Sequence, residues 1–194
     1  MPRRSQEERT RSTRSALTTA ARGLFASRGY SAVSTDEIVR AAGVTRGALY
    51  HHYADKQALF RDVFEQIEAE ITDEISAAFS AESDHLAAMA AGVTLFLDIC
   101  QRPEVLRISL TDAPAVLGWS LWREIEAQHG LHLITAKLSA ATAEGLLPAT
   151  PSTEALAQLI LSAVIESALM IANGADREPT QQALMTLLLG LVRR

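Results

Sequence analysis

The sequence has a single cysteine, few glycines and prolines, few aromatic residues and no long unbroken apolar run. One cysteine, Cys100, cannot form an intrachain disulfide, which fits a protein of the reducing cytoplasm. The 194 residues include only 10 Gly and 6 Pro, and alternating β-branched segments are hard to find, so an all-α fold is expected. No uninterrupted apolar run reaches about eighteen residues, and the polar residues 1–9 lack the apolar core of a signal peptide. The sequence therefore predicts neither a membrane span nor a secretion signal.

Motifs of enzyme chemistry are also missing. No Gly-rich phosphate loop, HExxH pair or nucleophile elbow occurs. His129 and His132 have a spacing that could hold a metal, but no third ligand accompanies them, and the adjacent His51 and His52 point about 100° apart on a helix. We therefore expect no catalytic residues, no metal and no cofactor, and a protein that is not an enzyme.

Charge is distributed unevenly along the chain. The net charge of −5 alone argues against a nucleic-acid partner. However, residues 1–61 hold 11 Lys and Arg against 5 Asp and Glu, whereas residues 62–194 hold 7 against 18. A basic head followed by an acidic body predicts binding of a polyanion at one end only.

The segment 34–53 has the pattern of two short helices joined by a tight turn. Ser34 and Glu37 have the spacing of a capping box, Gly43 ends the first helix, and Thr45 begins the second. Because Leu49 faces inward, its neighbours on the second helix are left for solvent or a partner. This is the pattern of a helix-turn-helix, whose second helix enters the major groove of DNA.

The predicted DNA contacts lie at the two helix starts and along the second helix. Arg46 is the best candidate for a base contact, because a guanidinium can pair with two acceptors of guanine. Lys56, at the start of the next helix, is predicted to contact a phosphate. The complete set is Ser34, Thr35, Thr45, Arg46, Gly47, Tyr50, His51 and Lys56.

These residues carry a family resemblance. Gly29-Tyr30, residues 34–38, residues 42–53, Lys56 and Leu59 together resemble the DNA-binding domain of the TetR/AcrR family of bacterial repressors. The resemblance implies a homodimer on a palindromic operator of double-stranded DNA, released when a small molecule binds the acidic body. It also implies that the helix at residues 55–80 tilts on ligand binding and changes the spacing of the two heads.

The expected domains are a flexible basic arm at residues 1–9, the helix-turn-helix domain at 10–56, and a helical ligand-binding and dimerisation domain at 57–194. Arginines of the arm could reach phosphates or could simply be solvated. Beyond the head, helices are expected over residues 55–80, 84–101, 103–110, 119–146, 152–172 and 180–193, with a loop or short helical turns at 111–118.

Two residue sets in the acidic body are candidates for function. The effector is expected to be small and largely apolar, and its candidate contacts are apolar or aromatic residues plus one carboxylate: Met89, Val93, Phe96, Trp119, Trp122 and Glu166. The tryptophans are also explained as core residues, and Glu166 by an internal hydrogen bond. The helix at 152–172 is apolar on most sides, which favours a four-helix dimer interface built with the last helix from Leu156, Ile160, Val164, Leu184, Leu188 and Leu191.

Two other functions remain open at this point. A helical small-molecule-binding protein or enzyme with non-specific DNA affinity would share the basic head and apolar body. An architectural DNA binder would show the same salt dependence without preferring one palindrome.

Overall fold

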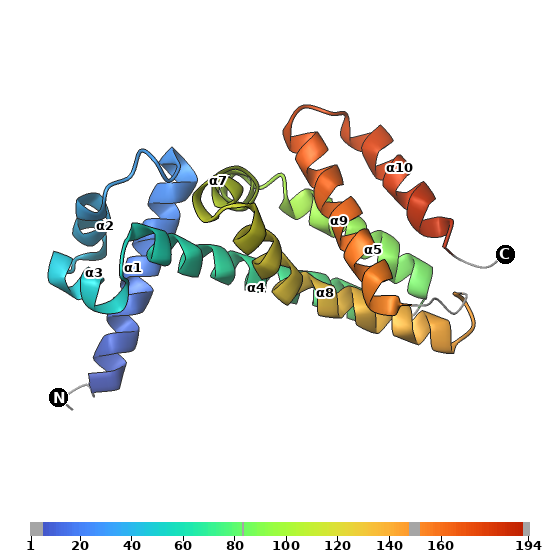
Figure 1. Ribbon diagram of the computed structural model, residues 1–194, viewed down its shortest axis with the longest axis horizontal. Helices are drawn as coiled ribbons and strands as arrows, with labels where there is room; N and C mark the ends of the chain where they lie inside the picture. Colours follow the sequence, from blue (N-terminus) through green and yellow to red (C-terminus); the bar gives the residue numbers. More distant parts are fainter. Residues whose placement is uncertain (1–5, 83, 148–151, 192–194) are drawn as a thin grey trace. The chain divides into compact units, whose positions relative to one another are not determined.

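The computed structural model describes residues 6–82, 84–147 and 152–191, and in these ranges the regular structure is entirely helical (Figure 1). The expected all-α fold is thus confirmed. The elements are α1 (Gln6–Arg28), α2 (Thr35–Ala42), α3 (Arg46–His52), α4 (Lys56–Ala81), α5 (His85–Ile99), α6 (Pro103–Val105), a π-helix η1 (Leu106–Asp112), α7 (Ala113–Leu117), α8 (Trp119–Ala143), α9 (Thr153–Ala172) and α10 (Arg177–Leu189).

The packing divides the chain into two compact units. The first unit contains residues 1–67 and 103–119, and the second contains 68–102 and 120–194. Helix α4 is continuous across residue 67 and therefore contributes to both units. The sequence boundary at 56/57 differs from this division, because the first part of α4 and the segment 103–119 pack with the head.

The caps of α2 and α3 fix the turn between them. The Ser34 hydroxyl accepts a hydrogen bond from the Glu37 N–H, and the Glu37 carboxylate accepts one from the Ser34 N–H, which completes a capping box. Gly43 ends α2 at φ 65°, in the left-handed region that favours glycine. The Thr45 hydroxyl then accepts a hydrogen bond from the Ala48 N–H and begins α3. These local bonds explain why the sequence pattern was sufficient to place both helices.

An apolar core holds the three head helices against the first part of α4. Its fully buried members include Leu17 and Phe25 of α1, Ile38 of α2, Leu49 of α3 and Phe60 of α4. The Phe25 and Phe60 rings meet edge to face, with centroids 5.3 Å apart.

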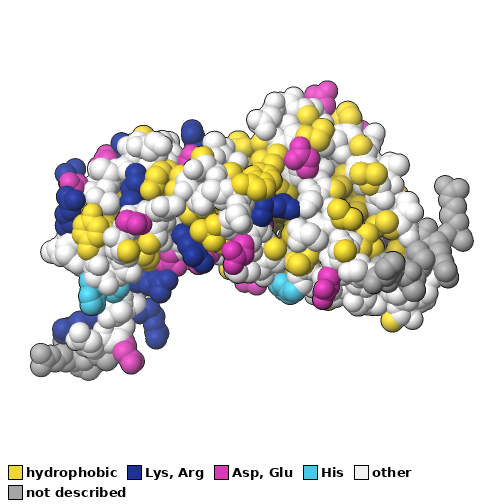
Figure 2. Space-filling model, in the orientation of Figure 1, with side chains coloured by type: hydrophobic (Ala, Val, Ile, Leu, Met, Phe, Trp, Pro, Cys, Tyr) yellow, Lys and Arg dark blue, Asp and Glu magenta, His cyan; other side chains and the backbone are white. Residues whose placement is uncertain are grey.

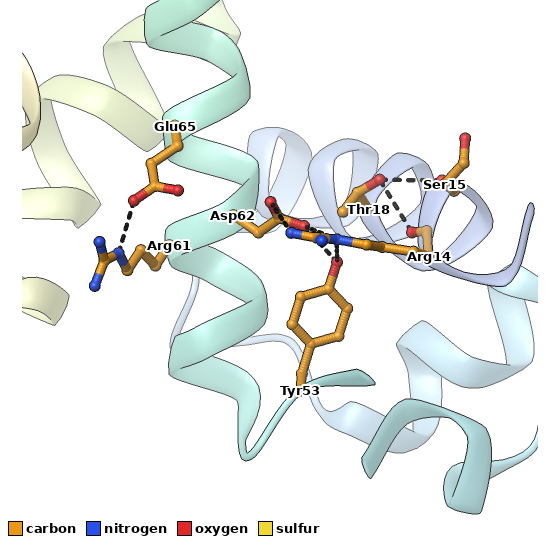
Figure 3. Close-up of polar contacts among 7 residues, drawn as sticks. All are labelled: Arg14, Ser15, Thr18, Tyr53, Arg61, Asp62 and Glu65. Carbon is orange, nitrogen blue, oxygen red and sulfur yellow. Dashed lines mark hydrogen bonds and ion pairs between the residues drawn. The ribbon is translucent and has the colours of Figure 1, made fainter. Parts of the chain in front are cut away.

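A polar cluster joins the same elements at one side (Figure 3). Asp62 of α4 accepts hydrogen bonds from the Arg14 guanidinium at 2.9 and 3.1 Å, and also binds the Tyr53 hydroxyl. Burial, and then the bond to Asp62, raise the pKa of Tyr53. Because α1, the end of α3 and α4 each supply one member, the cluster fixes their relative rotation.

The segment 103–119 is helical except at Gly118, so that of the loop and the short helical turns that the sequence allowed over 111–118, the structure has the helical turns. Its π-helix η1 is followed directly by α7. Two polar contacts fasten it to the head: Glu104 pairs with Arg22 of α1, and the Asp112 carboxylate accepts a hydrogen bond from the Tyr30 N–H at 2.7 Å. These partners lie 82 residues away in the sequence, so short-range signals do not predict this geometry.

The start of α1 also differs from expectation. The helix begins at Gln6, so residues 6–9 are helical rather than part of a flexible arm. Glu7 and Glu8 lie in the first turn, where carboxylates interact favourably with the helix dipole. Arg3 and Arg4 lie outside the described residues.

The second unit is formed by the rest of α4 with α5, α8, α9 and α10. Its fully buried side chains include Leu97, Trp122 and Ile125. Helix α9 is long and apolar enough to cross a membrane by length and composition, with a mean hydropathy of 2.0 over its best window, although the sequence predicted no span. One such helix is weak support for a membrane location, because core helices of soluble proteins pass the same test.

We predict that Asp112→Ala lowers the free energy of unfolding by about 1–2 kcal/mol, because the Tyr30 N–H loses its acceptor in a partly buried place. Urea unfolding measures the loss. Asp112→Asn retains an acceptor oxygen and should preserve most of the stability. Equal stability of both variants and the parent would show that this bond does not hold the segment.

Candidate nucleic-acid interface and internal cavity

Helix α3 presents a polar, exposed face above its buried Leu49. Thr45, Arg46, Gly47, Tyr50 and His51 are all exposed. At the start of α2, Ser34 is exposed and Thr35 is half-buried. The structure thus brings together seven of the eight predicted DNA contacts around one turn.

Arg46 is held in place on this face. Its Nη1 donates to the Asp36 carboxylate at 3.0 Å, and its guanidinium lies 5.6 Å from the centre of the Tyr50 ring. The side chains of Arg46 and Asp36 are each more than half exposed, so the pair is an exposed one of low strength. The guanidinium is therefore positioned and still accessible to a partner.

Lys56, the eighth predicted contact, has a different role in the structure. Its Nζ donates to the carbonyl oxygens of Tyr30 and Val33 at 3.0 and 2.8 Å, and lies 3.9 Å from the centre of the Tyr30 ring. Burial lowers the pKa of this amine. The prediction of a phosphate contact is thus corrected: Lys56 fastens the turn between α1 and α2 to α4, an arrangement that only the folded chain creates.

Basic side chains surround the helix-turn-helix on the surface of the first unit (Figure 2). Arg9 and Arg11 of α1 and Arg40 of α2 are exposed, and Arg28 pairs with Glu37. Hydrogen bonds from the Ser34 N–H and then from Arg28 lower the pKa of Glu37 to about 2. The charge asymmetry seen in the sequence is therefore a property of the folded surface as well.

The histidines do not form a metal site. The His51 and His52 rings lie 5.2 Å apart in an edge-to-face arrangement, and burial lowers the pKa of His52. No group of three or more His, Cys, Asp or Glu suited to a metal occurs in residues 6–82, 84–147 and 152–191.

The second unit encloses a cavity of about 210 Å³ between its helices, with mostly apolar walls. Met89, Val93 and Phe96 of α5, three of the six predicted ligand contacts, line it. Gly92 leaves room for the Phe79 ring in the cavity wall. A Cβ at position 92 would lie 2.1 Å from Cε1 of Phe79, so any other residue there would require a shift of that ring.

The other three predicted ligand contacts lie elsewhere, and these predictions are corrected. Trp119 is 62% exposed and belongs to the first unit, and Trp122 is fully buried in the core without reaching the cavity wall. Glu166 is exposed on α9, about 200° around the helix from Val164 and about 100° from Ile165, the buried residues that do line the cavity. Apolar periodicity finds a buried face but does not distinguish core from cavity.

Two buried carboxyl groups in the cavity wall were not foreseen. Glu68 of α4 and Glu126 of α8 are 9% and 6% exposed. Burial, and then the neighbouring Glu68, raise the pKa of Glu126 to about 9. Their 58-residue separation leaves no local sequence signal, and Glu126 stands in the polar stretch 123–129, which predicts an exposed position.

Comparisons with known proteins agree on one family. A model described as "Tetracyclin repressor-like, C-terminal domain" matches residues 86–194, and a second, described as "Bacterial regulatory proteins, tetR family", matches residues 17–63. The chain belongs to the TetR family. This confirms the resemblance drawn from residues 29–59.

Individual relatives of this TetR-family chain are regulators. It is 31% identical to a TetR-family transcriptional regulator of Pectobacterium atrosepticum, with a TM-score of 0.82 over 98% of this chain and 99% of that one. It is 31% identical over 139 residues to the transposon Tn10 TetC protein of Escherichia coli, covering 70% of this chain and 66% of that protein. AcrR of Shigella flexneri, an HTH-type transcriptional regulator, is 42% identical over 71 residues, 37% of this chain and 33% of its own length. The matches thus span less than two thirds of these two curated relatives. The families and relatives are regulators rather than enzymes, as the sequence predicted.

The residues predicted for a dimer interface face inward in this TetR-family chain. Val164, Leu184 and Leu188 are at most 8% exposed. The other three, Leu156, Ile160 and Leu191, are partly buried and pack against a core cluster around Leu138 and Ala157. The prediction is corrected, because α9 is apolar on two sides and the set chosen is the side that packs within the chain.

We predict that Lys56→Met lowers the free energy of unfolding by about 1–2 kcal/mol, since two carbonyl groups lose a charged donor. Urea unfolding measures this. Arg61→Met is the matched control on the same helix: its exposed pair with Glu65 should contribute less than about 1 kcal/mol. Unchanged stability of Lys56→Met, together with weaker and less salt-dependent DNA binding, would restore the phosphate role.

Proposed function

We propose that the protein is a cytoplasmic, homodimeric repressor of transcription. Two α3 helices, one from each chain, read the half-sites of a palindromic operator, and a small, largely apolar effector in the cavity releases the DNA. The observation that supports this most directly is the exposed polar face of α3, with Arg46 positioned on it and basic side chains around it. The proposal includes Lys56 as a support of this geometry.

We infer different tasks for the members of this face. Arg46 suits guanine, because its planar fork matches two acceptors on the major-groove edge. Tyr50 is 45% exposed beside it, available to a phosphate or a thymine methyl group. The N-terminal ends of α2 and α3, with Ser34, Thr35, Thr45 and Gly47, suit phosphate oxygens, since unpaired N–H groups point outward there.

A second copy of the chain is the proposed partner of the outer face of α9 and α10. Leu159 and Met170 of α9 are 68% and 46% exposed, and Leu187 of α10 is 67% exposed. On α9, Leu159, Ala163 and Met170 fall on one stripe at helical spacing. A dimer places two recognition helices on one DNA, which a single short helix needs for selectivity.

Helix α4 supports the proposed release mechanism. Its first residue, Lys56, holds the turn between α1 and α2, and its later residues Ile71, Ile75 and Phe79 line the cavity. A rotation of α4 caused by an effector would therefore move that turn. The effector must bind one orientation of α4 better than the other for this to occur.

The first experiment is selection of bound DNA from a random pool, followed by Arg46→Ala on the recovered sequence. We expect a palindrome with half-sites about one helical turn apart. Arg46→Ala should cost about 1–3 kcal/mol of binding and relax base preference at one position per half-site. Thermal unfolding should not change, because the Asp36 pair is exposed.

Arg102→Ala is the control for this substitution, because Arg102 forms a similar exposed pair with Glu74 in the second unit. It should bind as the parent does. An unaltered base preference in Arg46→Ala would show that Arg46 does not contact a base. DNA recovered without a shared sequence would instead indicate a non-specific binder.

Leu187→Glu should weaken the proposed dimer, because it puts a charge into an apolar contact on both chains. We expect sedimentation to show dissociation at concentrations where the parent is dimeric. Leu189→Glu is the matched control: it lies on the same helix, is 47% exposed and points about 160° away. Equal behaviour of the two variants would place the interface elsewhere.

A further inference from the structure

One end of the cavity combines buried carboxyl groups with apolar walls. Glu68 and Glu126 meet there from α4 and α8, and the lining residues that α9 supplies to the cavity are all apolar: Ile160, Leu161, Val164 and Ile165. Burying carboxyl groups in such a place is unfavourable unless something compensates them.

Other groups of the chain offset the unfavourable burial of the Glu126 carboxyl group only in part. Its Oε2 is buried and accepts no hydrogen bond from any group in the described part of the chain. The Arg123 Nη1 lies 3.5 Å away, while Nη2 of the same guanidinium donates to the Ser162 hydroxyl at 2.6 Å. The ion pair is thus a long one, and Oε2 is left able to accept a further donor.

Burial, and then the neighbouring Glu68, raise the pKa of Glu126, and Arg123 acts in the opposite direction. The Cys100 thiol is near both carboxyls, and burial, followed by those carboxyls, raises its pKa so that it stays neutral. Because the pKa of Glu126 is about 9, its carboxyl group is protonated at neutral pH.

The walls define the kind of molecule that would complete this end. A purely apolar guest would leave the buried Oε2 with neither a donor nor a countercharge, and an anion would face two carboxyl groups. A positively charged nitrogen on an apolar body fits both the carboxyl groups and the apolar walls, because an amine can donate an N–H to Oε2 and a quaternary nitrogen supplies the countercharge. The Phe96 ring in the lining attracts cations as well. The cavity exceeds the roughly 150 Å³ that admits benzene, so a substituted ring is of suitable size.

Lys137, a cationic residue of the lining, does not conflict with such a guest. It lies three turns along α8 from Glu126, about 16 Å by helical rise. Its Nζ donates to the Phe79 carbonyl oxygen at 3.2 Å, which holds it at the other end of the cavity.

We propose that the end of the cavity formed by Glu68 and Glu126 binds the positive nitrogen of a small hydrophobic amine or quaternary ammonium compound. This rests on the proposed function, in which the cavity is the effector site, and names the chemical class of the effector. Binding a permanent cation favours ionised Glu126, so a proton leaves its carboxyl group for solvent as the complex forms.

The test compares two molecules of nearly equal shape, phenyltrimethylammonium and its neutral counterpart tert-butylbenzene. Calorimetry with the full chain should show that the cation binds at least about tenfold more tightly. Its affinity should rise with pH, by up to about tenfold per unit between pH 6 and pH 8, because Glu126 must lose its proton. Two buffers of different ionisation enthalpy should reveal proton release. Equal or tighter binding of tert-butylbenzene would overturn the proposal.

Variants distinguish binding at these two carboxyl groups from a general effect of removing negative charge from the protein. Glu126→Gln should abolish both the preference for the cation and the pH dependence, and Glu68→Gln should weaken the preference. Glu166→Gln, which changes an exposed carboxylate of α9, should retain both. An unchanged preference in Glu126→Gln would contradict the proposal.

Folding of Glu126→Gln can be checked independently. A carboxyl group whose pKa is raised by folding makes the protein less stable as pH rises from its ordinary value of 4.5 towards 9. The amide does not titrate, so the parent should lose stability across this range relative to Glu126→Gln. Glu68→Gln supplies the binding test if Glu126→Gln does not fold.

The operator recovered by DNA selection distinguishes the two proposals. Cation binding at Glu126 without release of that operator would retain the cation site and reject its effector role. Specific operator binding with no cation preference would retain the regulator and reject the cation site.

Discussion

The continuity of α4 is the constraint on which the rest of the structure depends. One unbroken helix supplies Phe60 to the core of the head, Asp62 to the polar cluster with Arg14, and Phe79 to the cavity wall. All three environments therefore lie along one helical backbone. In the proposed function, a ligand that favours one rotation of this helix would act on the head through it.

The sequence predicted elements well where the determining contacts are local. The Ser34–Glu37 capping box, the left-handed Gly43 and the Thr45 cap each involve residues at most five apart, so the helix-turn-helix was evident. It did not predict how the segment 103–119 packs on the head, because Asp112 bonds a backbone group 82 residues away. Lys56 failed for the same reason, because its carbonyl partners come together only in the fold.

The same distinction between local and long-range contacts applies to the candidate sites. Met89, Val93 and Phe96 were found because an apolar stripe of α5 has to be buried, and in this chain that stripe lines a cavity. The apolar periodicity of α9 does not show which of its two apolar faces is buried within the chain. For this reason the sequence assigned the predicted dimer residues, Val164 among them, to a partner chain. Glu68 and Glu126 line one cavity because of the fold of the second unit, and no repeat in the sequence indicates it.

The Arg46–Asp36 pair has a consequence for the selectivity of the proposed regulator. A guanidinium already matched with a carboxylate gains little by exchanging that partner for one phosphate oxygen. Guanine offers two acceptors at once, so the exchange is favourable there. In the proposed regulator, Asp36 would therefore compete more effectively with a single phosphate contact of Arg46 than with a guanine. Where non-specific sites vastly outnumber operators, such a carboxylate would favour the operator by weakening contacts that do not depend on sequence.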